Sequence, residues 1–191
     1  MGTPAAAASV CLAEFAASGA EALANPADTG SGDCAIDDPV TFQRIRTAEG
    51  GVIALESAVT LRCAFAVEVV RWVKDDLAAI AAAEGRKLAK LTSVGGYACR
   101  GRNRVAGAPL SEHATGNALD LGSLQMQDGR NATLYGREAE TKTLREAVRK
   151  SACARFATVL GPGADASHQD HLHVDLRQRR SDYKMCQWTV D

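Results

Sequence analysis

The chain has 191 residues, which is enough for one packed domain with a small appendage. Hydrophobic residues make up 46% of the chain and charged residues 24%, a composition that excludes wholesale disorder. The formal net charge of −1 gives no overall attraction to nucleic acid or to an anionic membrane, and no apolar run reaches the roughly 18 residues of a membrane span.

The first segment, residues 1–45, is rich in alanine and then in turn-forming residues. We expect a short helix around Ala13–Leu23, followed by a loop in which Asn, Pro, Asp, Gly and Ser accumulate. A local disulfide between Cys11 and Cys34 would anchor this stretch. We therefore treat residues 1–45 as a disulfide-anchored N-terminal segment that precedes the domain carrying the chemistry.

Residues 57–84 show the clearest helical pattern in the chain. Apolar side chains recur there at steps of three and four residues. Ser57 is suited to cap the start of this helix, and Gly85 is suited to end it. Trp72 falls among the apolar positions, so we expect its indole in the core.

Shorter elements follow this helix. We expect a second helix at 137–152 and strands at Lys90–Tyr97, 117–122, Phe156–Leu160 and His171–Leu176. Helices and strands are mixed without a regular βαβ alternation or an internal repeat. This order predicts an α+β fold with a small, mostly antiparallel sheet flanked by helices.

Six cysteines are spread along the chain, and none of them forms a C-x-x-C pair. Three disulfides are the expected use of this even number, and they would place the protein in the periplasm or at the cell exterior. The alternative is six free, buried thiols in a cytosolic protein. The first residues carry no export signal, so we expect that one has been removed.

All four histidines lie in two short segments. The first is S-E-H-A-T-G-N-A-L-D at 111–120, and the second is H-Q-D-H-L-H at 168–173. A single histidine is more often a packing or surface residue than a ligand. Three histidines within six residues, together with a fourth beside a carboxylate, favour a metal site.

The spacing suggests how the ligands are shared. His171 and His173 would point the same way along a strand, about 6.6–7 Å apart, which suits one on the metal and the other beside its open position. Gly116 permits a chain reversal that returns Asp120 toward His113. His113, Asp120 and one histidine of 168–173 would make three N/O ligands, which is typical of a catalytic zinc site with a free fourth position.

These two motifs, S-x-H-x-x-G-x-A-x-D and H-x-H, resemble those of the zinc peptidases of the lysostaphin, D-Ala-D-Ala peptidase and hedgehog superfamily. Within this superfamily, the chain is most similar to the bacterial extensin-like C-terminal domain family. The resemblance covers about residues 55–186 and is supported by the segments Gly96–Arg100, Phe156–Gly163 and His171–Asp175. It implies a disulfide-stapled hedgehog/D,D-peptidase-like fold, with residues 46–191 as a zinc peptidase-like catalytic domain.

The resemblance also implies the roles of the histidines. His113, Asp120 and His173 would bind one zinc ion, and His171 would be the general base or transition-state stabiliser beside it. His168 would line the same pocket, as in the murein endopeptidase branch. The D,D-dipeptidase branch has a glutamate where this chain has His171, so an endopeptidase-like pocket is favoured.

Substrate contacts are implied for Arg100 and Ser111. Arg100 resembles an arginine that steadies the scissile carbonyl or the substrate carboxylate, although its spacing from Tyr97 differs and a solvated loop arginine is the alternative. Asp175 would either orient a histidine or end a strand in solvent. The implied reaction is hydrolysis of an amide bond in peptidoglycan stem peptides or cross-links, with D,D and L,D bonds both open.

Two other functions remain open from the sequence. One is a non-catalytic zinc-containing module that binds the cell wall or a protein. The other is a disulfide-stapled structural domain whose histidines bind no metal. The presence of His171 beside an open fourth position favours the enzyme.

Overall fold

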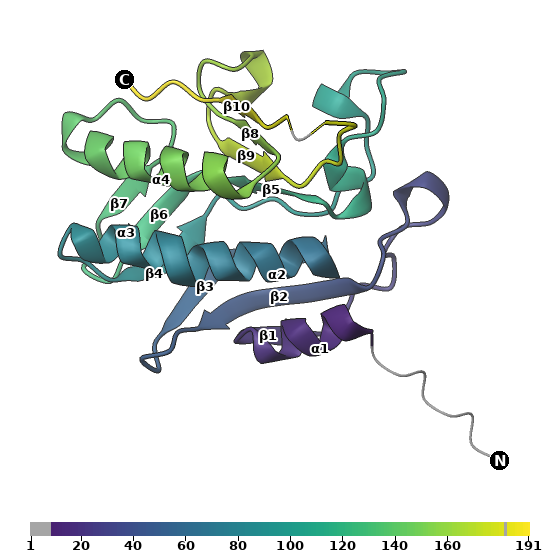
Figure 1. Ribbon diagram of the computed structural model, residues 1–191, viewed down its shortest axis with the longest axis horizontal. Helices are drawn as coiled ribbons and strands as arrows, with labels where there is room; N and C mark the ends of the chain where they lie inside the picture. Colours follow the sequence, from purple (N-terminus) through teal and green to yellow (C-terminus); the bar gives the residue numbers. More distant parts are fainter. Residues whose placement is uncertain (1–8, 182) are drawn as a thin grey trace.

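The computed structural model describes residues 9–181 and 183–191, which form two β-sheets with helices packed against them (Figure 1). The first sheet has the order β1 (Ala20–Leu23), β2 (Pro39–Arg46), β3 (Val52–Arg62), β4 (Leu88–Thr92), β6 (Ser123–Met126) and β7 (Asn131–Thr133). The second sheet has the order β10 (Met185–Gln187), β8 (Thr158–Leu160), β9 (Leu172–Asp175) and β5 (Ala118–Leu121). N-terminal residues 1–8, on which the expectation of a removed export signal rests, lie outside the described residues.

Most neighbouring strands run antiparallel, and only the pairs β3–β4 and β8–β10 are parallel among the strands described. The expected α+β class and the mostly antiparallel pairing are therefore confirmed. The expectation of one small sheet is wrong, because the strands divide into a six-stranded and a four-stranded sheet. Strands as short as β7 and β10 have too few residues to show an alternating pattern.

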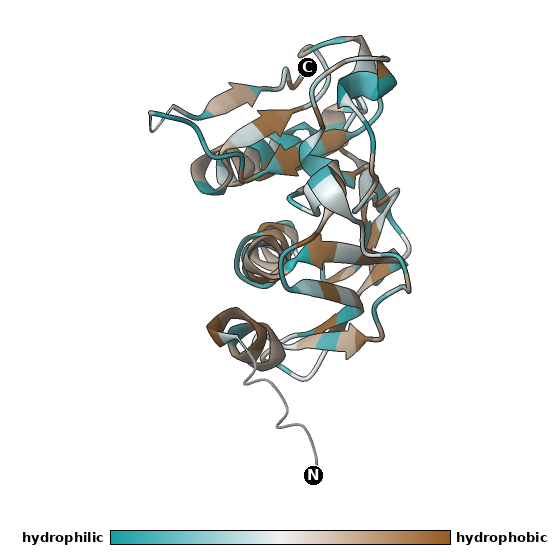
Figure 2. Cartoon of the chain, turned by 90° about the vertical axis from the view of Figure 1, so that its right-hand side faces the viewer, coloured by the Kyte–Doolittle hydropathy of each residue, from teal (hydrophilic) through white to brown (hydrophobic). Residues whose placement is uncertain are grey.

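A helical rod crosses the middle of the molecule. It is formed without interruption by α2 (Cys63–Arg71), a π-helical stretch (Trp72–Leu77) and α3 (Ala78–Ala83). In Figure 2 the rod is seen end-on, with α1 (Val10–Ala17) below it and the four-stranded sheet above it. None of the helices in the described parts of the chain has the length and apolar character needed to cross a membrane.

Trp72 fixes the rod against α4 (Lys142–Arg155). Its side chain is fully buried, and its ring packs edge-on against Phe156 with 5.1 Å between centroids. The indole Nε1 donates a hydrogen bond of 2.9 Å to Ser151 Oγ of α4, which satisfies the one polar atom of the ring. The expected place of Trp72 in the core is confirmed.

The rod begins at Cys63, so the expected helix start at Ser57 is wrong. Residues 57–62 belong to β3, in which Ile53, Leu55, Val59 and Leu61 are buried. Apolar residues near the junction fit both a two-residue and a three- to four-residue repeat, so the helical pattern could be extended backwards into the strand. The expected end is confirmed, because Gly85 follows α3 with a φ of +70°.

Two further expected elements are longer than the real ones. The helix expected over Ala13–Leu23 ends at Ala17, because Gly19 takes a φ of +97° and the chain then forms β1. The strand expected over Lys90–Tyr97 is β4, which ends at Thr92.

The segment 1–45 and the rest of the chain meet within one sheet. The expected boundary falls inside β2, and β2 pairs with β3 from Pro39 opposite Arg62 to Arg46 opposite Val52. Strand β1 then pairs with β2 at the edge of the same sheet. The N-terminal segment is thus attached through backbone hydrogen bonds as well as through disulfides.

Three disulfides are present, as expected, and they join Cys11 to Cys63, Cys34 to Cys99 and Cys153 to Cys186. The expected local pair Cys11–Cys34 is wrong. Helix α1 packs on α2, which brings Cys11 to the first residue of the rod. Disulfides of this kind are typical of proteins that function outside the cytosol.

Candidate metal centre

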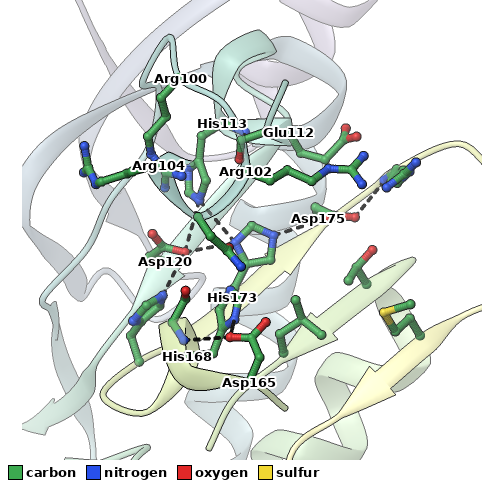
Figure 3. A pocket seen from close by; sticks show the side chains of 18 of the residues that line it. Arg100, Arg102, Arg104, Glu112, His113, Asp120, Asp165, His168, His173 and Asp175 are labelled. Carbon is green, nitrogen blue, oxygen red and sulfur yellow. Dashed lines mark hydrogen bonds and ion pairs between the residues drawn. The ribbon is translucent and has the colours of Figure 1, made fainter. Parts of the chain in front are cut away.

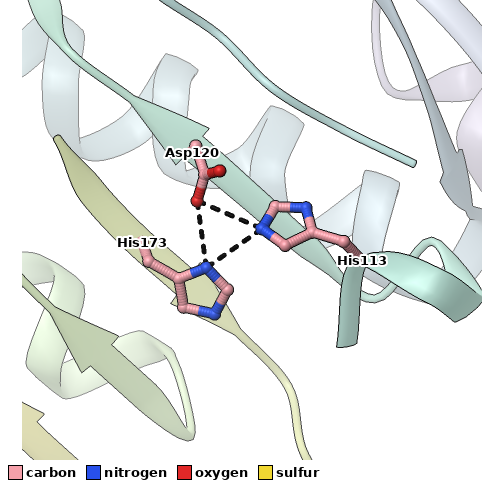
Figure 4. Close-up of side chains that lie close together, drawn as sticks. All are labelled: His113, Asp120 and His173. Carbon is pink, nitrogen blue, oxygen red and sulfur yellow. Dashed lines mark hydrogen bonds and ion pairs between the residues drawn. The ribbon is translucent and has the colours of Figure 1, made fainter. Parts of the chain in front are cut away.

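Three side chains from two distant segments converge on one point (Figure 4). Asp120 Oδ1 lies 3.1 Å from His113 Nε2 and 3.0 Å from His173 Nδ1. The two imidazole nitrogens are themselves 3.1 Å apart. The structure therefore brings together the three residues that the sequence analysis selected as metal ligands.

Two local features build this convergence. Strands β5 and β9 pair antiparallel with Asp120 directly opposite His173, which places their side chains next to each other on one face. His113 sits in a short 3-10 helix, η4 (Glu112–Thr115), which ends at Gly116 with a φ of +65°. A Cβ at Gly116 would lie only 2.7 Å from the backbone nitrogen of Arg62, so the reversal between η4 and β5 requires glycine here.

The outer nitrogen of each imidazole donates a hydrogen bond away from the centre. His113 Nδ1 donates to the backbone carbonyl of Gly96 at 2.7 Å, and His173 Nε2 donates to Asp175 Oδ2 at 3.2 Å. In the neutral imidazoles, the inner nitrogens then carry lone pairs. Two lone pairs and a carboxylate oxygen about 3 Å apart repel one another unless a cation lies between them. A carbonyl or carboxylate that accepts the outer N–H of each imidazole, as Gly96 and Asp175 do here, is common around metal-binding histidines.

The close contacts at this centre shift the pKa values of Asp120 and His173. Burial disfavours the charged form of Asp120, but hydrogen bonds from His113 and His173 outweigh it and lower the pKa of the carboxyl. Burial also disfavours a charge on His173, but its hydrogen bonds to Asp120 and Asp175 raise its pKa to about 9. Both shifts favour a negative Asp120 beside a positive group, which is the charge arrangement that a bound cation would also provide.

The donor set fits a zinc ion. Two imidazole nitrogens and one carboxylate oxygen are ligands that zinc prefers, and tetrahedral zinc with bonds of about 2.0–2.1 Å separates ligand atoms by about 3.3 Å. The observed separations of 3.0–3.1 Å are close to that value. Three protein ligands leave one position for another ligand, as in catalytic zinc sites, and all six cysteines are held in disulfides.

The other two histidines, His168 and His171, line the same pocket; Figure 3 labels His168. His171 immediately precedes β9, and its Nε2 lies 3.6 Å from Asp120 Oδ1 while its Nδ1 contacts Asp170 Oδ1 at 2.8 Å. His168 is buried, and its ring centroid lies 5.3 Å from that of His171. Burial lowers the pKa of His168 despite the neighbouring Asp165.

Sequence reasoning missed two aspartates that bind the pocket histidines: Asp165, which lines the pocket, and Asp170, which is exposed. Asp165 Oδ1 accepts a hydrogen bond of 2.7 Å from His168 Nδ1, and Asp170 accepts one from His171. The available signal was the spacing D-x-x-H at 165–168 and the adjacent pair Asp170-His171. Each aspartate fixes which ring nitrogen of its histidine carries the proton.

Asp175, for which two roles were open, is a buried partner of His173. Its side chain is 5% exposed, and it accepts hydrogen bonds from His173 Nε2 and from the backbone N–H of Arg177. Burial opposes the charge, but these bonds and one from Thr158 lower the pKa of the carboxyl. Asp175 therefore orients His173 and does not end a strand in solvent.

Arg100 and Ser111, the two expected substrate contacts, both line the pocket, which has a volume of about 420 Å³. Ser111 Oγ also accepts a hydrogen bond of 3.4 Å from His113 N, which caps η4 and helps to place the histidine. Arg100 Nε is buried and has no hydrogen-bond partner among the described residues. A buried donor of this kind is costly unless a ligand or water satisfies it.

Comparison with known proteins agrees with the family suggested by the motifs. The family model described as "Extensin-like protein C-terminus" matches residues 9–187, which is nearly the whole chain. No curated protein and no solved structure matches the chain at a significant level. The chain therefore belongs to the family of the extensin-like protein C-terminus.

Proposed function

We propose that this protein is a zinc-dependent hydrolase that cleaves an amide bond in peptidoglycan stem peptides or their cross-links, in the periplasm or outside the cell. The observation that carries the proposal is the convergence of His113, Asp120 and His173, with their lone pairs directed inward and a further histidine beside them. The placement in the lysostaphin, D-Ala-D-Ala peptidase and hedgehog superfamily, with its hedgehog/D,D-peptidase-like fold, belongs to this proposal and is the source of the substrate.

His113, Asp120 and His173 would hold the ion. A bound zinc ion supplies Lewis acidity, which polarises an amide carbonyl and makes water more acidic. Asp175 and the carbonyl of Gly96 keep the two imidazoles in the orientation and protonation state that binding needs. These outer contacts are formed within the protein itself, so the site is organised before a metal arrives.

His171 is positioned to transfer a proton from the attacking water to the leaving amine. Its Nδ1–H donates to Asp170, which leaves the lone pair on Nε2, the atom that faces Asp120. Nε2 can take a proton from an attacking water and return it to the leaving amine. About a quarter of the His171 side chain remains exposed, so substrate and water can reach it.

His168 and Arg100 complete the pocket around the reacting amide. His168 uses Nδ1 to bind Asp165, so its Nε2 is available for a contact with the substrate. The guanidinium of Arg100 can donate to a carbonyl or carboxylate oxygen of the substrate, which would satisfy its buried Nε–H. Ser111 lies on the same wall as a hydroxyl donor.

Digestion of murein tests the proposal. Zinc-loaded protein is incubated with purified murein and with defined 4–3 and 3–3 cross-linked dimers, and the products are identified by mass spectrometry. We expect new muropeptides from the wild type and from Gln178→Ala, an exposed control, but not from His171→Ala. If no product forms and murein is bound tightly, the protein is a non-catalytic zinc-containing module instead.

A further inference from the structure

The pocket carries more positive charge than the proposed chemistry uses. Five arginines line it, and we call them the arginine rim: Arg100, Arg102, Arg104, Arg177 and Arg179. Four carboxylates line the same pocket: Glu112, Asp120, Asp165 and Asp175. A divalent ion at the metal centre would add two further positive charges. The pocket as a whole would therefore attract anions.

The carboxylates of the pocket are already engaged. Asp120 lies between two histidines, Asp165 binds His168, and Asp175 binds His173. Glu112 accepts a hydrogen bond of 2.7 Å from Asn117 Nδ2. Among the described residues, none of these carboxylates lies within 4.0 Å of a rim guanidinium.

Most arginines outside the pocket behave differently. Nine of them, all outside the pocket, form ion pairs with carboxylates, whereas no arginine of the rim has such a partner among the described residues. Arg179 has a structural role, because its guanidinium donates to Ala157 O and to Thr158 Oγ1 at 2.7 Å. For the remaining rim side chains the structure records no hydrogen bond to a described residue, so they are available to a ligand.

The backbone holds Arg102 and Arg104 in place. Their loop is closed at its base by a bridge between Gly101 and Leu110, and Cys99, just before it, is tied to Cys34. Within the loop, Asn103 and Arg104 take positive φ values of 51° and 58°, which are rare for residues other than glycine. Together with the bridge and the disulfide, these turns fix the backbone from which Arg102 and Arg104 extend.

Arg177 lies two residues after the end of β9, the strand that carries His173. Its backbone N–H donates to Asp175 Oδ1 at 2.9 Å, the aspartate that also binds the metal-centre residue His173. In the view of Figure 3, Arg100, Arg102 and Arg104 lie on one side of the histidine cluster and His168 with Asp165 on the other. The rim therefore borders the place where the scissile amide would bind.

We propose that the arginine rim binds a free carboxylate of the substrate, so that the protein acts on peptides that carry a carboxylate close to the cleaved amide. This inference rests on the proposed function and narrows its substrate class. Guanidinium groups bind carboxylates through paired, charge-assisted hydrogen bonds. The carboxylate comes from the chain terminus of the peptide or from an acidic side chain, and the test separates these two sources.

Three versions of one synthetic stem peptide provide the test: the free acid, its C-terminal carboxamide and its side-chain carboxamide. The dissociation constant and kcat/KM are measured for each peptide with the purified full chain. We expect the wild type to prefer the free acid over one of the two amides by roughly ten- to a hundredfold. The amide that loses affinity identifies the carboxylate that the rim binds.

Two variants assign the preference to the rim. Arg102→Gln combined with Arg104→Gln, and separately Arg177→Gln, should reduce the preference for the free acid to less than about threefold. Arg149→Gln on α4 is the matched control, since Arg149 also lacks an ion pair among the described residues but lies outside the pocket. Thermal unfolding of each variant confirms that it is folded.

The outcomes separate this inference from the proposed function. If the wild type binds and cleaves all three peptides equally, the rim inference is wrong and the hydrolase proposal stands. If no peptide is cleaved but the free acid binds more tightly and the rim variants lose that preference, the rim inference stands and the hydrolase proposal fails. A preference that survives in both rim variants overturns the inference.

Discussion

Removal of the Cys34–Cys99 disulfide is expected to destabilise the protein strongly. This disulfide joins residues separated by 65 positions, and it anchors the start of the loop that carries Arg102 and Arg104. In the chain-entropy model, closing a loop of this length in the unfolded chain is worth about 4 kcal/mol at 25 °C. For a domain of this size that loss corresponds to a fall in Tm of roughly 8–16 °C.

The measurement is equilibrium unfolding in urea of the wild type and of the variant with Cys34→Ser and Cys99→Ser. The variant with Cys153→Ser and Cys186→Ser is the matched control, because its disulfide spans only 33 positions. The shorter loop predicts a loss smaller by about 0.6 kcal/mol. An unchanged free energy of unfolding in the Cys34/Cys99 variant, or a clearly larger loss in the control, would refute the loop-entropy reasoning.

Three further predictions concern single side chains. The hydrogen bond from Arg155 lowers the pKa of Asp76 below its ordinary value of 3.8. Asp76→Asn should therefore lower the Tm near pH 7, and the Tm difference from the wild type should shrink as the pH falls below about 3.8. A Tm difference that persists at pH 2 would contradict this assignment. Asp175→Ala removes the partner of His173 Nε2 and should weaken zinc binding about 10- to 100-fold in a competition titration. Asp175→Asn keeps a hydrogen-bond acceptor and should retain more of the zinc affinity. Equal zinc affinity in the wild type and in Asp175→Ala would count against the orienting role of Asp175. His171→Ala should retain zinc but lower kcat by about 100-fold or more, and full activity in this variant would remove His171 from the mechanism.

The parts of the fold that the sequence predicted best are those with a local signal. The positions of β5, β8 and β9 follow from short apolar runs, and the site residues follow from the clustering of all four histidines. The helix expected at 137–152 is α4, which begins five residues later, at Lys142, after a separate 3-10 turn at Ala139–Thr141. Gly116 was expected to reverse the chain between His113 and Asp120, and its positive φ shows that it does so. Such features depend on neighbours in the sequence, so they can be read from it.

The features that sequence reasoning missed depend on contacts between distant residues. The strand β3 was taken as the start of a helix because its apolar residues lead directly into the rod at Cys63, and only the pairing with β2 distinguishes the two. The disulfide partners of Cys11 and Cys34 are set by the packing of α1 on α2 and by the loop that begins at Cys99. That the rim arginines form no ion pair with a carboxylate of the described residues depends on such distant contacts as well.

The most direct test of the account is zinc stoichiometry after equilibrium dialysis against zinc and removal of loosely bound metal, measured by plasma mass spectrometry. The wild type should retain about one zinc ion per chain, as should the control Asp170→Ala, while Asp120→Ala and His173→Ala should retain far less. A wild type without zinc, or equal zinc in wild type and Asp120→Ala, would show that these three side chains do not form a metal site.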